Sequence, residues 1–414
     1  MSAFNRSRWQ RYAIAVLSKL PILGEAGLML VMRRRMGGRV LTLKKVRNFI
    51  LANRESDLKR VEVKSLPYII NLDTINVCNL ACPFCVTGTK QLDRKPSRFP
   101  LEQAKAVIDK VKSHILIARF HNWGEPFLNK QLFELIRHAH DAGVYTTLSS
   151  NLSIKVENLA QKVVASGLDQ IHVSIDGLEQ STLERYRRNA DIELVYKNIR
   201  EIVAEKRRTG SSTPRLELAF LVFRHNEHEV PRLKEMQQEL GVESFTAHSA
   251  FINHESFVPR EEAFQPGHDI WQGSCHYLYS ELMVEADGNI SPCCTNTSAR
   301  FDVGTVAELD DVRAFWNKPV FQAMRAKGTD QKWVDENGQE METLCDYCQY
   351  IGNGEKKPEG SLSPLPPALI AAGDQFNHDL NDAGEHVPVK RPRIKYSQAS
   401  DTIEERTLSV QEIQ

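Results

Sequence analysis

The sequence predicts an α/β fold with a parallel sheet and crossover helices. Between residue 68 and about residue 252, short apolar runs of strand length alternate with longer amphipathic stretches. This alternation favours parallel strands joined by helices. The chain has 414 residues, of which 41% are hydrophobic and 26% are charged. This composition is typical of a globular protein. The length allows two domains, or one barrel with an appendage.

Six strands and five helices are expected in this region. Each expected strand is a short run rich in β-branched and aromatic residues. The strands are expected at residues 67–73, 115–120, 145–149, 170–175, 216–223 and 243–247. The helices are expected at residues 101–112, 130–141, 156–166, 191–208 and 228–240. Periodicity leaves open whether the sheet is doubly wound or curved toward a barrel. In both folds ligands gather at the carboxyl ends of the strands.

The first 65 residues are basic and apolar in pieces. They hold 15 Lys and Arg against 4 Asp and Glu, whereas the whole chain has 53 of each. No apolar run reaches the ~20 residues that span a bilayer. We expect a pair of helices packed on the body, with peripheral membrane contact through residues 1–65 as the alternative. The balanced net charge does not suggest a nucleic-acid partner. A cytoplasmic protein is therefore expected, with a place peripheral to the inner face of the membrane as the alternative.

The C-terminal part has a different character. Asp287-Gly288 between apolar residues predicts a hairpin, and a helical stretch is expected near 305–327. The segment beyond Gly354 is polar and rich in proline, which predicts disorder. The predicted organisation is an N-terminal helical segment (1–65), an α/β domain (66–255), a small α+β domain (256–353) and a disordered tail (354–414).

Three cysteines follow the first expected strand with the spacing CxxxCxxC: Cys78, Cys82 and Cys85. Structural zinc sites are closed by four protein ligands, and iron–sulfur clusters are normally held by four thiolates. Three thiolates therefore indicate a cluster with one iron open to another ligand. A zinc knuckle, or a chance cluster of cysteines, is the alternative.

This motif, with Phe84 before its last cysteine, resembles the cluster motif of the radical S-adenosylmethionine (SAM) superfamily. The resemblance implies a partial (β/α)6 TIM-like barrel and a [4Fe–4S] cluster. It also implies that the open iron chelates the amino and carboxylate groups of SAM. The implied partner is an external one-electron reductant of the flavodoxin or ferredoxin type.

A second motif, Asn122-Trp123-Gly124-Glu125-Pro126, follows the second strand. A carboxylate beside a glycine lets charge and backbone approach an ammonium group closely. The segment resembles the family's GGEP motif, with Gly124 and Glu125 as the matching positions. The resemblance places further cofactor contacts at later strand ends and beside the adenine ring: Phe84, Ser150, Asn151, Ser174 and Asp176. Helix caps, turn formers and a core aromatic are the alternative interpretations of these residues. Arg224, His225 and Asn226 follow the fifth strand and are expected to reach the same pocket.

Four later thiols can close a metal site: Cys275, Cys293, Cys345 and Cys348. The pattern Cys-x12-Gly-x4-Cys followed by CxxC resembles the SPASM/Twitch extension of radical SAM enzymes. Because no cysteine follows Cys348, the resemblance is to the shorter Twitch-like form with one auxiliary iron–sulfur cluster. A structural zinc is the alternative.

Cys294 is left over beside Cys293. A thiol at that place could give or take a hydrogen atom or a proton, so it is a tentative catalytic residue. A small buried hydrophobe is the alternative.

The resemblance thus predicts an enzyme that cleaves SAM reductively and abstracts a substrate hydrogen. We expect redox modification of a carbohydrate or lipid-linked small molecule by dehydrogenation, epimerisation or dehydration. A peptide-modifying enzyme is the alternative, since the substrate can be a small molecule or a peptide. Outside enzymes, the alternative is a zinc-binding interaction protein.

Overall fold

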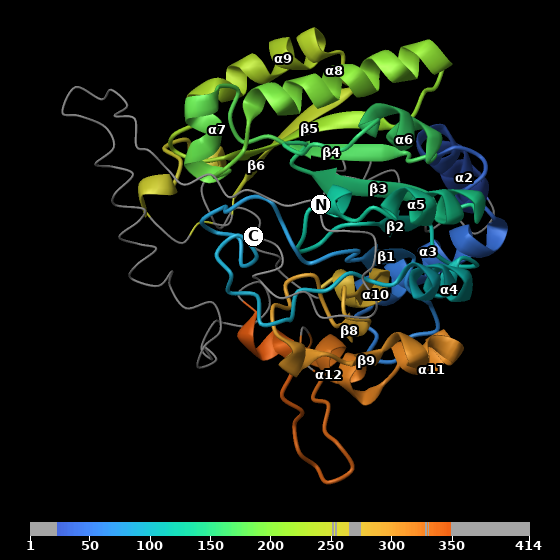
Figure 1. Cartoon of the computed structure of the whole chain (residues 1–414). Coiled ribbons are helices and arrows are strands. Elements are labelled where there is room, and N and C mark those ends of the chain that lie inside the picture. The colour runs from blue at the N-terminus through green and yellow to red at the C-terminus, as the bar shows by residue number, and fades with distance from the viewer. Residues whose placement is uncertain are drawn as a thin grey trace.

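A computed structural model describes residues 23–250, 252, 255–264, 275–327, 329 and 331–348. Its centre is one sheet with the strand order β6-β5-β4-β3-β2-β1-β7-β8-β9. In Figure 1 the strands run from β6, near α8 and α9, to β9, near α11 and α12. The predicted disordered tail at 354–414 lies outside the described residues, as does the start of the N-terminal segment.

The six predicted strands are confirmed as parallel neighbours in sequence order. Most residues of the first five strands are buried, which is typical of a parallel sheet covered by helices. The strands are β1 (Ile69–Leu72), β2 (Ile117–Arg119), β3 (Tyr145–Ser150), β4 (Gln170–Ser174), β5 (Arg215–Val222), β6 (Ser244–Ser249), β7 (Glu281–Val284), β8 (Asn289–Ser291) and β9 (Gly304–Thr305).

Helices cover the outer face of the parallel strands. They are α4 (Leu101–Val111), α5 (Leu132–Asp141), α6 (Leu159–Ala165), α7 (Gln180–Tyr186), α8 (Ile192–Thr209) and α9 (Leu233–Leu240). Asp191 is the N-cap of helix α8, and its side chain accepts the N–H of Leu194. Gly210, with φ +67°, is the C-cap. The helix expected over 228–240 starts as a 3₁₀ segment, η3 (Glu227–Arg232), which contains Pro231. The sequence did not predict α7.

Two N-terminal helices close the amino end of the sheet: α2 (Leu23–Met36) and α3 (Leu43–Asp57). Leu28 and Phe49 share an apolar cluster with Ile69, Ile117 and Tyr145 of the first three strands. The described part of the N-terminal segment is therefore packed on the body, as predicted. Among the helices that the structure describes, none is both long and apolar enough to cross a membrane.

The predicted hairpin is confirmed as β7 and β8, which turn at Gly288 with φ +84°. Strand β7 also pairs in parallel with β1, so the barrel sheet continues across the predicted domain boundary. The stretch near 305–327 is three helices rather than one: η7 (Val306–Asp311), α11 (Val312–Trp316) and α12 (Pro319–Lys327). Pro319 starts a new helix because it suits a first helical turn and disrupts a helix interior.

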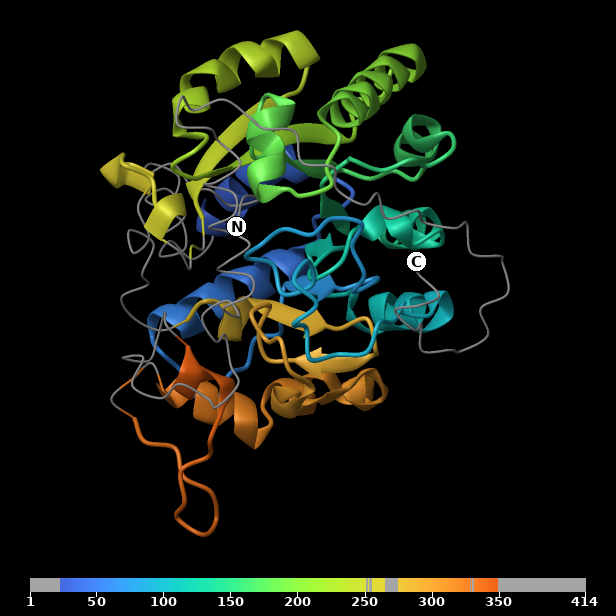
Figure 2. The same ribbon diagram turned by 60° about the vertical axis from the view of Figure 1, so that its left-hand side comes forward.

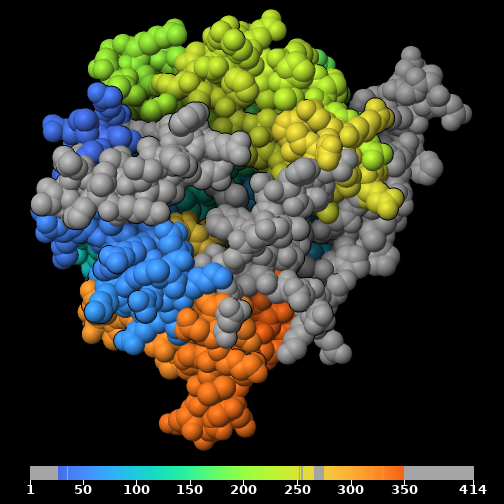
Figure 3. Space-filling view, turned by 180° about the vertical axis from the view of Figure 1, so that it is seen from behind, coloured from blue at the N-terminus to red at the C-terminus, as the bar shows by residue number. Residues whose placement is uncertain are grey.

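The C-terminal helices lie against both the hairpin and the N-terminal part. Figure 2 shows the orange helices of residues 306–327 below the amber strands β8 and β9. A short helix, α10 (Tyr277–Ser280), precedes β7 and contacts α3. On the face shown in Figure 3, blue N-terminal residues border orange C-terminal ones. Val63 and Asn317 join these two parts of the chain by two hydrogen bonds of 2.9 Å.

Candidate functional site

The three N-terminal cysteines lie together in the loop that follows β1. The Cys85 N–H donates to the Cys82 carbonyl over 3.2 Å. Burial raises the pKa of Cys82 to about 12 although Arg187 lies near, and Cys85 adds to the rise. Burial and then Glu125 raise the pKa of Cys78, with smaller contributions from the other two thiols. Buried thiols of this kind ionise when a metal supplies positive charge, so the donor set fits an iron–sulfur cluster.

Gly124 brings the second motif against this loop. A Cβ atom on Gly124 would lie 1.8 Å from the Ile75 carbonyl oxygen and 2.9 Å from that of Val77. Only glycine permits this approach. The next residue, Glu125, donates its N–H to the Val77 carbonyl over 2.9 Å. The structure therefore joins the Gly124-Glu125 motif directly to the residues before Cys78.

Glu125 is buried and holds three donors. Its Oε1 accepts the Phe127 N–H at 3.2 Å and the Ser150 hydroxyl at 2.8 Å, and its Oε2 accepts the Asn151 N–H at 2.9 Å. Burial raises the pKa of this carboxyl, and the three hydrogen bonds oppose the rise. A carboxylate has about four lone-pair sites, so Oε2 retains one acceptor position.

Asn151 lies beside the first cysteine. Its amide donates to the Asn79 side chain at 3.0 Å and approaches Cys78 Sγ at 4.0 Å. Ser150 and Asn151 therefore connect the end of β3 to both motifs. The Ser150 hydroxyl points to Glu125, so its first role is to hold that carboxylate.

Asp176 is fully buried, and its two oxygens have protein partners. One accepts the Leu221 N–H at 2.7 Å, and the other lies 2.6 Å from Arg187 Nε. Its carboxylate thus holds Arg187 near Cys82, a role that the sequence reasoning missed. Ser174 ends β4 and is half-buried. The Asn226 side chain donates to the Asp176 carbonyl at 2.9 Å and so helps to fix the Asp176 backbone.

Phe84 joins an aromatic cluster. Its ring lies 4.8 Å from Phe257, 5.9 Å from Tyr186 and 6.2 Å from Phe223, between ring centroids. His225 stacks on Phe223 at 5.5 Å, and burial lowers the pKa of His225 to about 3. The Arg224 guanidinium donates to the Val258 carbonyl. These rings are tilted or edge-on to one another, and Phe84 packs against the apolar core.

The four C-terminal thiols also come together. Burial raises the pKa of Cys345 well above its ordinary value, and Cys275, Cys293 and Cys348 add to the rise. A 3₁₀ turn, η8 (Leu344–Tyr347), presents the CxxC pair. This donor set suits a second cluster by the same argument. Within the described ranges, no three His, Cys, Asp or Glu side chains are arranged to hold a single metal ion.

Cys294 is half-buried and lies near polar residues of β2 and β7. Its thiol hydrogen-bonds with Cys293, and its electrostatic neighbours include Glu281 and Arg119. Arg119 Nη1 pairs with Glu281 Oε2 at 2.7 Å, and Asn71 donates to the same oxygen at 2.8 Å. Polar residues at alternate positions of expected strands were the signal that could have revealed this interior.

The interior stays polar further along the sheet. His172 Nδ1 lies 3.1 Å from Glu217 Oε1, and Glu217 also accepts the hydroxyls of Ser244 and Thr246. Burial would raise the pKa of Glu217, but these bonds hold it below its ordinary value. His121 is half-buried, and its buried Nδ1 has no hydrogen-bond partner within the part of the chain described here. Barrel interiors are usually filled by apolar layers, and this group of paired polar side chains departs from that pattern.

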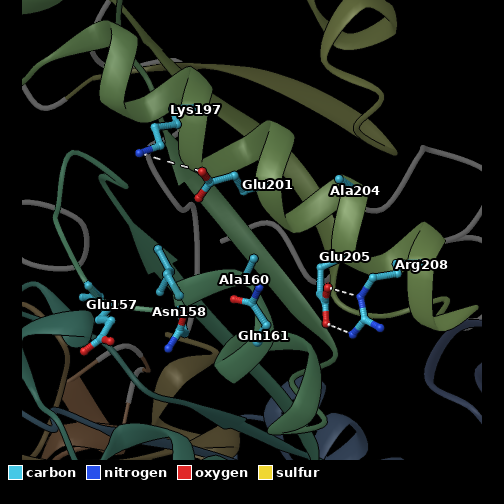
Figure 4. Close-up of a pocket in the computed structure, with 11 residues that line it drawn as sticks. Glu157, Asn158, Ala160, Gln161, Lys197, Glu201, Ala204, Glu205 and Arg208 are labelled. Carbon is cyan, nitrogen blue, oxygen red and sulfur yellow. Dashed lines mark hydrogen bonds and ion pairs between the residues drawn. The ribbon is translucent and has the colours of Figure 1, made fainter.

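A separate groove of about 670 Å³ lies between α6 and α8 (Figure 4). Its charged residues pair with each other, Lys197 with Glu201 and Arg208 with Glu205. None of the predicted site residues lines it. We therefore place the chemistry at the cysteine loops.

These features define an iron–sulfur protein with a SAM-type barrel, and comparisons with known proteins identify its family. The radical SAM superfamily matches residues 72–233, and the iron–sulfur cluster-binding SPASM domain matches residues 275–349. The chain therefore contains a radical SAM domain and a SPASM domain. These two domains imply a [4Fe–4S] cluster, SAM and an auxiliary iron–sulfur cluster, which the two cysteine sets fit.

Two curated relatives and one solved structure illustrate the range of proteins to which this chain is similar. The chain is 24% identical over 193 residues to a PqqA peptide cyclase of Bradyrhizobium diazoefficiens, covering 46% of this chain and 48% of that protein. It is 25% identical to a probable GTP 3',8-cyclase of Methanocaldococcus jannaschii, covering 49% and 61%. The matches thus span about half the length of these relatives. Streptococcus suis SuiB bound to S-adenosylmethionine has the same fold, with TM-score 0.53, 12% identity and coverage of 80% and 82%.

Proposed function

We propose that this protein cleaves SAM reductively and removes a hydrogen atom from a substrate in the barrel. When bound, the cluster and SAM supply the radical chemistry, and the protein supplies binding, orientation and exclusion of water. The observation that carries the proposal is the direct junction of the Gly124-Glu125 motif with the Cys78 loop.

Each residue of this junction has a distinct task. Gly124 lets the two backbones meet, and Glu125 offers its remaining acceptor position to the amino group of SAM. Asn151 fixes Asn79 beside Cys78 and so orients the loop. Arg187, held by Asp176, places a positive charge near Cys82. A fixed positive charge favours the thiolate form that binds iron.

A peptide is the substrate class that the comparisons favour. PqqA peptide cyclases recur among the curated relatives. The buried polar interior, with Arg119, Glu281, His172 and Glu217, would bind amide or hydroxyl groups. That interior also accommodates a small polar molecule such as a carbohydrate, which stands as the second proposal.

Reduction of the anaerobically reconstituted chain with SAM tests the reaction class. We expect 5′-deoxyadenosine and methionine in equal amounts. Synthetic peptides and nucleotide sugars, added separately, then distinguish the substrate classes. A substrate of the active class should raise 5′-deoxyadenosine formation, and its own consumption should keep pace with that formation. A chain that binds SAM but never cleaves it would overturn the proposal.

A further inference from the structure

The loop that carries the three N-terminal cysteines continues to a buried arginine. The side chain of Arg94 is 1% exposed, nine residues after Cys85. Its two terminal nitrogens pair with the two oxygens of Asp302, and Nη1 also pairs with Asp287 at 3.1 Å. Both carboxylates belong to the segment around the β7–β8 hairpin, so one guanidinium joins the two cysteine loops.

Neighbouring contacts repeat this connection. The Asp93 N–H donates to the Thr297 carbonyl at 3.1 Å, and the Ser298 hydroxyl donates to Asp93 Oδ2 at 2.7 Å. These contacts lie four and five residues beyond Cys293. We call the set of Asp93, Arg94, Ser298 and Asp302 the Arg94 brace.

The brace also reaches the ends of two barrel strands. Arg94 Nη2 donates to the Ser291 hydroxyl at 3.1 Å and lies 3.8 Å from Glu285, the residue after β7. The Asp73 N–H, just after β1, donates to the Val284 carbonyl at 2.8 Å. Arg94 therefore contacts the ends of β7 and β8, which pair with each other, and not loops alone.

From these contacts we infer that the Arg94 brace makes the two cysteine loops one rigid unit, which fixes the separation and orientation of their clusters. This inference rests on the proposed function, because it assumes that both loops are loaded. Arginine suits the task since its planar fork binds a carboxylate with two parallel bonds. Removing one partner of a buried ion pair leaves uncompensated charge, so the contact resists partial opening.

Hydrogen exchange on the full chain with both clusters tests the inference. In Arg94→Gln, amides of residues 86–98 and 293–303 should exchange faster together, by at least about tenfold. In the doubly reduced protein, the magnetic coupling between the clusters in the electron paramagnetic resonance spectrum should change. Arg300→Gln is the matched control, because Arg300 is exposed and pairs with Glu342 at 3.3 Å. It should leave both signals unchanged.

The iron content decides how each result is interpreted. If Arg94→Gln keeps its iron and shows faster exchange in one segment only, or in neither, the inference is wrong. If that variant fails to fold, Asp302→Asn is measured instead and should open both segments together. An opening confined to the segment around Asp302 would overturn the inference. Exchange does not depend on SAM cleavage, so failure of the proposed function would appear separately, as absence of 5′-deoxyadenosine in the unmodified protein.

Discussion

Substitution of Glu125 by Gln probes the junction of the two motifs. A glutamine has one carbonyl oxygen, and that oxygen can replace Oε1, which serves Phe127 and Ser150. The amide nitrogen then faces the Asn151 N–H across the 2.9 Å that Oε2 now spans. Two donors meet, and a hydrogen bond to a charged acceptor is lost. Such a bond contributes about 1.5–3 kcal/mol, so we expect Glu125→Gln to lower the free energy of unfolding by about 2 kcal/mol.

Urea unfolding of the reconstituted protein measures this loss, and SAM titration accompanies it. Because the variant also loses the charge that faces the ammonium group, SAM affinity should fall at least about tenfold, which corresponds to 1.4 kcal/mol. The matched control is Glu134→Gln, since the Glu134 side chain is 62% exposed and pairs with Lys105. Exposed pairs contribute about 0–1 kcal/mol. If Glu125→Gln unfolds at the same urea concentration as the control, the assigned hydrogen bonds are wrong.

Three further predictions concern Gly124, Glu285 and Cys294. Gly124→Ala forces a Cβ to within 1.8 Å of the Ile75 carbonyl oxygen, so SAM affinity should fall at least about tenfold, and an unchanged titration would refute the close approach. Burial raises the pKa of Glu285 from 4.5 to about 7. The folded state therefore keeps a proton that the unfolded chain loses above pH 4.5, and this stabilisation disappears as the pH rises through 7. Glu285→Gln removes this pH dependence of stability. From pH 6 to pH 8 the urea midpoint of the variant should therefore fall less than that of the unmodified protein, and an equal fall in both proteins would contradict the raised pKa. Cys294→Ala should abolish product but preserve 5′-deoxyadenosine formation, and unchanged turnover would end any role for its thiol.

The sequence predicts much of the sheet because its strands are buried on both faces. Buried parallel strands appear as short apolar runs, and Ile69–Leu72 could be placed from such a run. The helix α7 was missed because Gln180–Tyr186 is short and mostly polar. The pairing of β7 with β1 was also invisible, since it joins residues about two hundred positions apart. No local pattern specifies such a contact.

The sequence predicts the motifs of the candidate site but not the side chains that hold these motifs in place. Cysteine spacing and Gly124-Glu125 are local patterns, so they could be found in one sequence. The contacts of Arg187 and Arg94 could not be found in this way, because a buried arginine looks like an exposed one until its carboxylate partners are placed. The partners of Arg94 at Asp287 and Asp302 lie about two hundred residues away in the sequence. Asp176 and Ser150 were expected to face SAM. In the structure Asp176 pairs with Arg187, and the Ser150 hydroxyl donates to Glu125.

The most direct test of the central claim is formation of 5′-deoxyadenosine by the chain with and without its first three cysteines. The unmodified, anaerobically reconstituted protein should release 5′-deoxyadenosine when it is reduced with SAM. A variant with alanine at Cys78, Cys82 and Cys85 should release none but should retain the iron and sulfide of the second site. Bound zinc in place of iron, or 5′-deoxyadenosine from the triple variant, would contradict the account.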